Sequence, residues 1–195
     1  FCPDETARYP AEVIFSGKLS YHANVTAAIY LIQEVMPIVW ASRPEVTVIL
    51  AGKDPARDVV QLARRYDRVQ VTGTVEDLRP YLRRATAAAA LVPYGVGIQN
   101  KVLEAMACGT AVVGSPQAAS ALQVLPGQDM LVAEGAQAQA RALELIVSDP
   151  DLRQRLGAGG RRYVERQHDW EKIAHQLEHY YLASNNTPGQ ESWKY

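Results

Sequence analysis

Three polar residues near the middle of the chain have types and a spacing that suit the binding of a ligand. Asn100, Lys101 and Glu104 follow the segment 95–97, which contains two glycines. If a helix begins near Ile98, successive side chains turn by about 100° per residue, so the three polar groups share one side. Backbone N–H groups at the start of such a helix attract phosphate. Solvent alone also explains a polar helix side, and the glycine loop at the same end is what favours a ligand. The other side of the helix would hold the apolar residues Ile98, Val102, Leu103, Ala105 and Met106.

Glycine and lysine residues also follow other segments that are predicted to be strands. The pair Gly17-Lys18 follows the first such segment, Gly52-Lys53 follows the second, and Gly73 ends the third. In an open parallel sheet, ligands bind outside the carboxyl ends of the strands. Lysines gathered at this edge, together with a helix N-terminus, favour a ligand that carries a diphosphate.

The elements that must position these residues alternate along the chain. Short apolar runs predict strands, and apolar residues recurring every three or four positions predict helices. We expect strands at 12–16, 46–50, 69–72, 86–92, 111–113 and 130–133, and helices at 24–40, 55–66, 77–84, 98–108, 137–147, 149–167 and 169–182. Pro37 should kink or restart the first helix. The alternation predicts an α/β fold with a Rossmann-like parallel sheet that has helices on both faces.

Composition limits the classes of protein to which the chain can belong. With 195 residues, 48% of them hydrophobic, the chain can form a globular core. Its net charge of −1 argues against nucleic acid as a partner and against an electrostatic membrane anchor. We expect no membrane-spanning segment, because the longest apolar stretch, residues 85–93, is far too short to span a bilayer. Cys2 and Cys108 offer no disulfide framework and suit a reducing compartment, so we expect a cytoplasmic protein. The chain opens with Phe1 and no signal peptide is evident, so we expect a piece of a longer protein.

Other known sites fit the sequence poorly. The third glycine of a dinucleotide fingerprint is replaced by Asn100, and the chain contains no Walker Gly-x-x-x-x-Gly-Lys-Ser/Thr. Lys18 stands where a response receiver would have acidic residues. His175 and His179 could share one helix face, but no third metal ligand is evident, and we expect no metal. No serine or cysteine has a setting typical of a nucleophile.

Residues 97–113 resemble the signature of family 4 glycosyltransferases, which ends in Glu-Ala-Met-Ala-Cys/Ser-Gly-x-Pro-Val-Val. Residues 97–101, Gly-Ile-Gln-Asn-Lys, resemble the form of this motif in the bacterial sugar transferases of exopolysaccharide synthesis. Residues 15–18 resemble that family's phosphate-binding turn, and residues 71–75 the turn that meets the nucleobase. Residues 1–3 resemble the end of its interdomain linker, and residues 168–170 the start of its last helix. The resemblance covers about residues 1–182.

The resemblance implies the C-terminal, donor-binding half of a two-domain glycosyltransferase of the B-type fold. Residues 1–10 would be the remnant of the linker, 11–182 the nucleotide-sugar domain, and 183–195 a polar, disordered tail. The missing N-terminal domain would hold the acceptor. The whole protein would be a retaining enzyme that transfers a hexose from a nucleotide diphosphate sugar to a polysaccharide or lipid-linked acceptor at the membrane periphery. It would need no cofactor besides the donor substrate, and the fragment alone would be inactive.

The resemblance also implies roles for individual residues. Glu104 would bind the ribose hydroxyls, and Lys18 with backbone N–H groups would hold the diphosphate as the leaving group. Val75 would offer backbone contacts to the base. Lys18, Lys101 and Glu104 are the expected catalytic residues. The full expected binding set is Gly17, Lys18, Val75, Gly97, Ile98, Gln99, Asn100, Lys101 and Glu104.

The chain departs from the family pattern at two positions. Val96 stands eight residues before Glu104, where the family has an acid that meets the donor sugar. Asn24 stands where a basic residue should follow Lys18. Lys101 either supplies the lost charge, or it pairs with Glu104 or faces solvent. A nucleotide-sugar epimerase and a non-catalytic nucleotide-binding regulatory domain therefore stay open as alternatives.

Overall fold

The chain is described by a computed structural model that covers residues 1–3, 8–9, 11–94 and 97–185. Gly95, Val96 and residues 186–195 of the predicted tail lie outside the described residues. Residues 183–185, which we expected to begin the tail, belong to the last helix instead.

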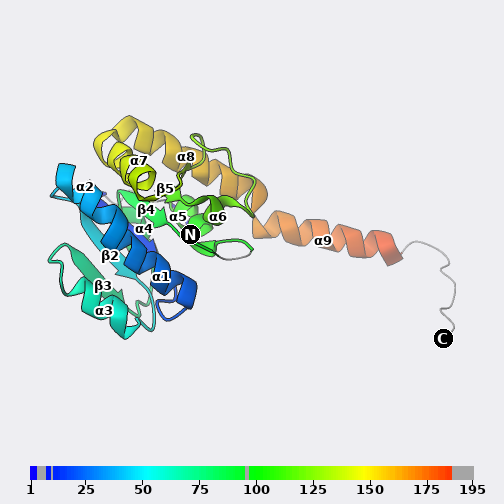
Figure 1. Ribbon diagram of the computed structural model, residues 1–195. Coiled ribbons are helices and arrows are strands. Elements are labelled where there is room, and N and C mark those ends of the chain that lie inside the picture. Colours follow the sequence, from blue (N-terminus) through cyan, green and yellow to red (C-terminus); the bar gives the residue numbers. More distant parts are fainter. Residues whose placement is uncertain (4–7, 10, 95–96, 186–195) are drawn as a thin grey trace.

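A parallel sheet forms the middle layer of the domain (Figure 1). Its six strands lie in the order β3-β2-β1-β4-β5-β6. The strands are β1 Glu12–Ser16, β2 Thr47–Ala51, β3 Val69–Gly73, β4 Ala87–Ala90, β5 Ala111–Gly114 and β6 Leu131–Val132. Their pairing confirms the predicted Rossmann-like α/β fold. The strand order reverses between β1 and β4, and in doubly wound sheets this is where a ligand crevice opens.

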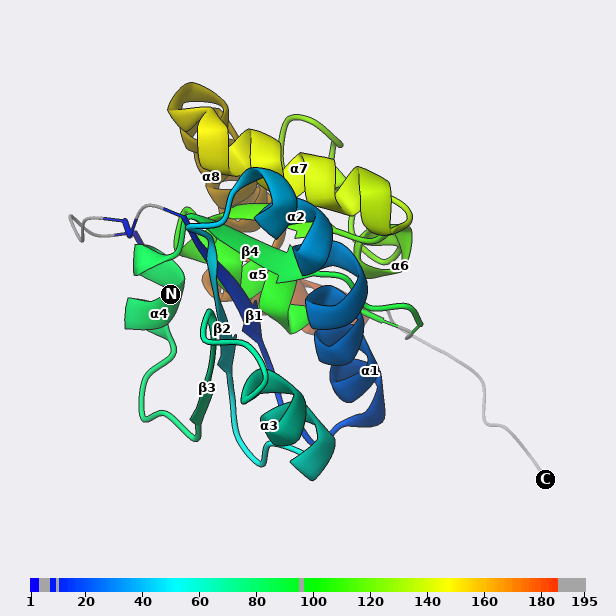
Figure 2. The same ribbon diagram turned by 60° about the vertical axis from the view of Figure 1, so that its left-hand side comes forward.

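Helices cover both faces of the sheet (Figure 2). One layer contains α1, α2, α3 and α7, and the other contains α4, α5 and α8, as the contacts of α7 with α2 and of α5 with α8 indicate. The helical elements are α1 His22–Tyr30, the π-helical turn η1 Leu31–Val35, α2 Met36–Ser42, α3 Arg57–Ala63, α4 Arg79–Arg84, α5 Asn100–Ala107, α6 Pro116–Ala119, α7 Ala136–Ser148, α8 Pro150–Gln167 and α9 Trp170–Asn185. α9 extends away from the sheet (Figure 1).

The first helical segment is irregular at the place where a proline was predicted to disturb it. A π-helical turn, η1, precedes Pro37, which lies in the first turn of α2. Proline has no N–H and its ring clashes with the carbonyl of residue i−4, so the helix widens before Pro37 and continues after it. Leu31, Ile32 and Met36 are buried along this segment.

The same segment, His22–Ser42, is also long and apolar enough to cross a membrane by length and composition alone. It has 21 residues and a mean hydropathy of 1.4. The expectation from the sequence used residues 85–93, which are a shorter stretch than this one. A helix of this composition is also typical of a globular core, and here the segment contributes Ala27, Leu31, Ile32 and Val35 to the same hydrophobic core as the sheet.

Helix α5 begins two residues later than expected. Gln99 is its N-cap, with an extended backbone, and Asn100 is its first residue. Ile98 therefore precedes the helix and is 50% exposed, so its predicted place on the buried face is wrong. The extended backbone of Gln99 explains the late start, because a helix cannot include a residue in this conformation. The buried face of α5 is formed by Val102, Ala105, Met106 and Ala107.

Helix α6 was not predicted. Ser115 caps it by accepting a hydrogen bond at 3.2 Å from the N–H of Ala118, and Pro116 follows in the first turn. The Ser-Pro pair is a typical helix start, but the helix is too short to show apolar periodicity.

Helix α8 approaches the turn after α5 closely because it carries glycines at the contact. A Cβ placed on Gly157 would lie 2.3 Å from the carbonyl oxygen of Gly109, and one on Gly159 would lie 2.0 Å from that of Gln128. Carbonyl groups of the backbone cannot give way cheaply, so this helix must shift as a whole to admit a larger residue.

We expect Gly157→Ala to lower the free energy of unfolding by about 1–2 kcal/mol, because overpacking outweighs the gain in helix propensity. Chemical denaturation measures the change. Ala158→Gly is the matched control at the next, exposed position, where only helix propensity changes. A Gly157→Ala protein more stable than the parent would contradict the close packing of α8.

Candidate functional site

The turns after β1 and β2 are locked together at the carboxyl edge of the sheet. The N–H of Gly17 donates to the Ala51 carbonyl at 3.0 Å, and the N–H of Leu19 donates to the Lys53 carbonyl at 2.9 Å. Gly52 has a φ of +154°, and a Cβ on it would lie 1.7 Å from the Gly17 carbonyl oxygen. Only glycine allows the two backbones to meet this closely.

Lys101 reaches from the first turn of α5 to the end of β1. Its Nζ donates to Asn24 Oδ1 at 2.5 Å and lies 4.3 Å from the centroid of the Phe15 ring. Asn24 is itself held, because its Nδ2 donates to the Lys18 carbonyl at 3.0 Å. A Cβ on Gly17 would lie 3.6 Å from Lys101 Nζ, so the ammonium group lies beside an open backbone turn.

This arrangement bears on the two hypotheses for Lys101. The structure brings Lys101 to Asn24, the residue that replaces the expected basic side chain, and the Lys101 side chain is partly buried. A lysine that only faced solvent would not be held by an amide and an aromatic ring. Phosphate binding by Lys101 stays a prediction.

Burial shifts the pKa values of the two ionisable side chains on α5, Lys101 and Glu104. It lowers the pKa of Lys101 to about 8, while the negative charge of Glu104 opposes this change. Burial likewise raises the pKa of Glu104, and Lys101 partly offsets this. The two groups lie three residues apart on α5 and stabilise each other's charge, so an additional anion near Lys101 would favour its ammonium form.

Lys18 is arranged differently from Lys101. Its side chain is 54% exposed, and its Nζ lies 4.0 Å from the Asp54 carboxylate. An exposed pair at this distance contributes little, roughly 0–1 kcal/mol. Lys18 can therefore leave Asp54 for a ligand at small cost.

The start of α5 offers backbone donors. Gln99 makes no side-chain capping bond. The first N–H groups of an α-helix have no partner within the helix. Gly97, Ile98 and Asn100 are exposed around this turn. Together these features leave the beginning of α5 accessible to an anion.

Val75 lies farther from Lys101, and the histidines His175 and His179, which are not expected to bind a metal, belong to α9. Val75 follows β3, which lies two strands from β1 at the same edge. Among the residues that the structure describes, no group of three or more His, Cys, Asp or Glu side chains could hold a metal ion. On α9, His175 instead lies 3.7 Å from Glu178, and both side chains are exposed.

Three residues near the site were missed by the sequence analysis. The Tyr94 hydroxyl contacts Nδ1 of His22 and lies 3.3 Å from Thr26 Oγ1. The Tyr94 and His22 rings are 5.7 Å apart. Nothing in their spacing could have signalled this, because Tyr94 belongs to the loop after β4 and the other two to α1.

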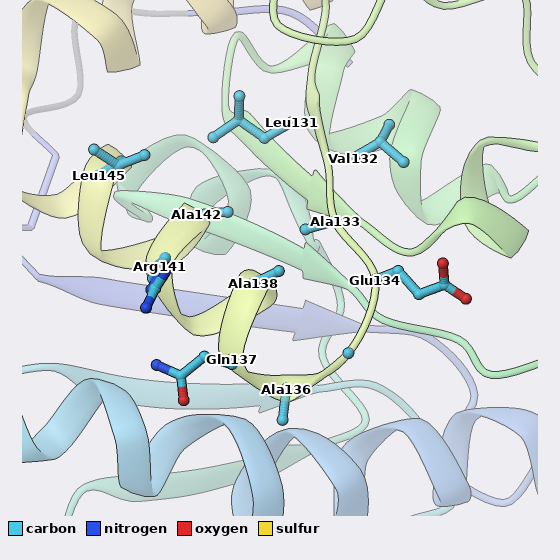
Figure 3. Close-up of a pocket in the computed structure, with 11 residues that line it drawn as sticks. Leu131, Val132, Ala133, Glu134, Ala136, Gln137, Ala138, Arg141, Ala142 and Leu145 are labelled. Carbon is cyan, nitrogen blue, oxygen red and sulfur yellow. The ribbon is translucent and has the colours of Figure 1, made fainter.

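A separate hollow of about 560 Å³ lies between β6 and α7 (Figure 3). Leu131, Val132, Ala138, Ala142 and Leu145 give it a mainly apolar wall. Glu134 points away from Gln137 and Arg141, so no polar groups converge in it (Figure 3). It lacks the few convergent polar groups that a small-molecule site needs.

The doubly wound parallel sheet, with its glycine turns locked together at the carboxyl edge and the Lys101 ammonium group at the end of β1, defines an α/β domain of the Rossmann-like class. Residues 10–149 match the family described as glycosyl transferases group 1. The chain belongs to this family.

Similar proteins are consistent with the family. The chain is 28% identical over 158 residues to the GDP-mannose-dependent monoacylated alpha-(1-6)-phosphatidylinositol monomannoside mannosyltransferase of Corynebacterium glutamicum, a match that covers 74% of this chain and 41% of that protein. S. aureus TarM, solved in complex with UDP, has a TM-score of 0.79 and 14% identity over 96% of this chain and 38% of its own. The C-terminal domain of LpcC, a glycosyl transferase group 1 family protein from Francisella tularensis, has a TM-score of 0.71 and 17% identity over 87% of this chain and 96% of its own. The chain thus spans less than half of the first two proteins.

Proposed function

We propose that this chain is the donor-binding half of a glycosyltransferase that transfers a sugar from a nucleoside diphosphate sugar. The observation that carries the proposal is the Lys101 ammonium group, which is held by Asn24 and Phe15 at the end of β1. It lies where a diphosphate between the β1 turn and the start of α5 would place its negative charge. TarM, a structural neighbour, was solved with UDP.

The site residues have distinct roles in this proposal. Glu104 accepts hydrogen bonds from the two ribose hydroxyls, which suits a carboxylate with two oxygens. Lys101, Lys18 and the N–H groups at the start of α5 hold the diphosphate. Their positive charge stabilises the leaving group as the bond to the sugar breaks. Val75 contacts the base from the end of β3.

The acceptor is proposed to be a polysaccharide or a lipid-linked sugar bound by a further domain. The name of the C. glutamicum relative contains a phosphatidylinositol monomannoside, which supports a lipid-linked acceptor. The family resemblance also leads us to propose an exopolysaccharide product and retention of configuration at the transferred sugar.

A thermal-shift panel of UDP, GDP and ADP with their sugars tests nucleotide binding. We expect the nucleotides that carry one of the three bases to stabilise the chain. Their dissociation constants should be on the order of tens of micromolar to millimolar. Absence of stabilisation by every nucleotide at concentrations about tenfold above this range would overturn the proposal.

We expect residues 1–195 alone to bind nucleotide and to transfer no sugar. Alignment of the acceptor and exclusion of water need a second wall of the crevice. Assays of transfer and donor hydrolysis on this chain and on the full-length protein make the comparison. Turnover by the chain alone would contradict the division of labour between two halves.

A nucleotide-binding domain without chemistry is the second candidate, because Val96 stands where the family pattern has an acid. A nucleotide-sugar epimerase is the third. Transfer by the full-length protein excludes the second candidate, and the identity of the product excludes the third.

Nucleotide binding should depend on pH above about 8. The pKa of Lys101 is lowered to about 8 in the free chain, so the ammonium form that binds phosphate is lost as the pH rises through this value. We expect the affinity for a nucleotide sugar to be steady from pH 7 to 7.5 and to fall by up to about tenfold per pH unit well above 8. Calorimetry between pH 7 and 9.5 measures this, with Lys101→Met as the variant that should lack the dependence. An equal fall in both proteins would assign the titration to another group.

A further inference from the structure

The proposed function leaves one side-chain cluster beside the crevice without a role. It consists of His22, Thr26 and Tyr94, and we call it the His22 cluster. Tyr94 contacts both of the other residues through its hydroxyl. All three side chains lie at the surface of the domain rather than in its core, so packing alone does not account for them.

The cluster shares its structural supports with the candidate site. His22 is the first residue of α1, and Asn24, two positions later, holds Lys101. Tyr94 lies in the loop that leads from β4 to α5. The first turn of α1 thus has two contacts with the segment that connects β4 and α5. His22 contacts Tyr94 in the loop, and Asn24 contacts Lys101 in the first turn of α5.

The strand order indicates which end of the ligand the cluster would meet. β1 lies between β2 and β4, and β3 lies beyond β2. The base is proposed at the end of β3 and the diphosphate at the end of β1. A donor that extends in the same direction reaches the loop after β4, so its sugar would lie on the side of Tyr94 and His22.

The hydrogen bonding of the cluster leaves one group for a ligand. The contact with Tyr94 uses Nδ1 of His22, whichever of the two groups donates. In one tautomer Nε2 then carries the proton and donates, and in the other it accepts. A sugar hydroxyl both donates and accepts, so it matches Nε2 in either tautomer.

We propose that Nε2 of His22 binds a hydroxyl group of the donor sugar, and that Tyr94 is the positioning residue that orients the imidazole ring. This inference rests on the proposed function and deepens it by assigning the sugar end of the site. It also supplies a polar partner for the sugar, for which the family pattern has an acid at the position that Val96 occupies in this sequence.

Calorimetry on the whole chain tests the assignment, with UDP, UDP-glucose, UDP-N-acetylglucosamine, GDP, GDP-mannose, ADP and ADP-glucose as probes. His22→Asn retains a group near the Nδ1 position for Tyr94 but lacks one at Nε2. We expect it to weaken the best-bound nucleotide sugar by about 3- to 10-fold, the effect of one lost hydrogen bond. The corresponding nucleoside diphosphate should bind as before.

Further variants separate recognition from loop support. His22→Gln places an amide near Nε2 and should restore part of the affinity for the sugar. Tyr94→Phe should also weaken only the nucleotide sugar, and by less. His179→Asn and Tyr180→Phe on α9 are the matched controls, and neither should change binding.

Three outcomes would count against the inference. Equal weakening of the nucleotide sugar and the nucleoside diphosphate by His22→Asn would make the cluster a support of the loop and overturn the assignment. Unchanged affinity of His22→Asn for the best-bound nucleotide sugar would also overturn it, while leaving nucleotide binding intact. Failure of every nucleotide to bind would instead overturn the proposed function itself.

Discussion

Replacing Glu104 by alanine is expected to weaken nucleoside diphosphate binding by about 10- to 150-fold. The physical reason is the loss of charge-assisted hydrogen bonds to the ribose, which are worth roughly 1.5–3 kcal/mol. Because Glu104 is partly buried, its carboxylate cannot be replaced easily by water. Isothermal calorimetry with the best-bound nucleoside diphosphate measures the change.

A conservative variant of Glu104 and a control at another glutamate help to interpret the loss of affinity in Glu104→Ala. Glu104→Gln keeps the size of the side chain and one acceptor oxygen, so it should show an intermediate loss. Glu45→Ala removes an exposed carboxylate before β2, at the amino edge of the sheet, and should leave binding unchanged. Unchanged affinity in Glu104→Ala would remove Glu104 from the site.

Replacing Lys101 by alanine is expected to weaken nucleoside diphosphate by about 10-fold or more and to leave nucleoside binding nearly unchanged. The difference arises because the ammonium group is proposed to meet only the phosphates. Its partial burial makes its charge more effective than that of an exposed lysine. Parallel titrations of nucleoside and nucleoside diphosphate isolate this contribution.

Alanine variants of two other basic residues show whether the effect of Lys101→Ala is specific. Lys18 is the second proposed phosphate ligand, and Arg64 is the control. Lys18→Ala should weaken nucleoside diphosphate by up to about fivefold, because the side chain is more than half exposed and its charge is screened. Arg64→Ala removes one positive charge after α3, away from the crevice, and controls for the net charge of the chain. If Lys101→Ala weakens nucleoside and nucleoside diphosphate equally, Lys101 does not meet the phosphates.

Local sequence determined most of the secondary structure. Residues 12–16 form β1 as predicted, because they combine apolar, β-branched and aromatic residues and end at Gly17. The predicted strand at 86–92 appears as Ala87–Ala90, where an alanine run is buried in the sheet. Such periodicities and glycine stops depend on neighbouring residues only, so they can be recognised without knowing the tertiary structure.

The sequence also placed the candidate residues at one edge of the sheet. In a parallel sheet every strand ends at the same edge, so Gly17, Gly52 and Gly73 had to lie on one side. The start of α5 was misjudged by two residues, because the extended backbone of Gln99 cannot be read from residue types alone.

Only the tertiary structure decided which of these residues meet. Lys101 contacts Asn24 and Phe15 because β4 pairs with β1, although the two segments are far apart in sequence. The contact of Tyr94 with His22 depends on the same pairing. The lowered pKa of Lys101 follows from burial, which is a property of the packed domain. Periodicity is set by neighbours in the chain, whereas strand order, burial and contacts between distant side chains are set by the packing of the whole sheet with its helices.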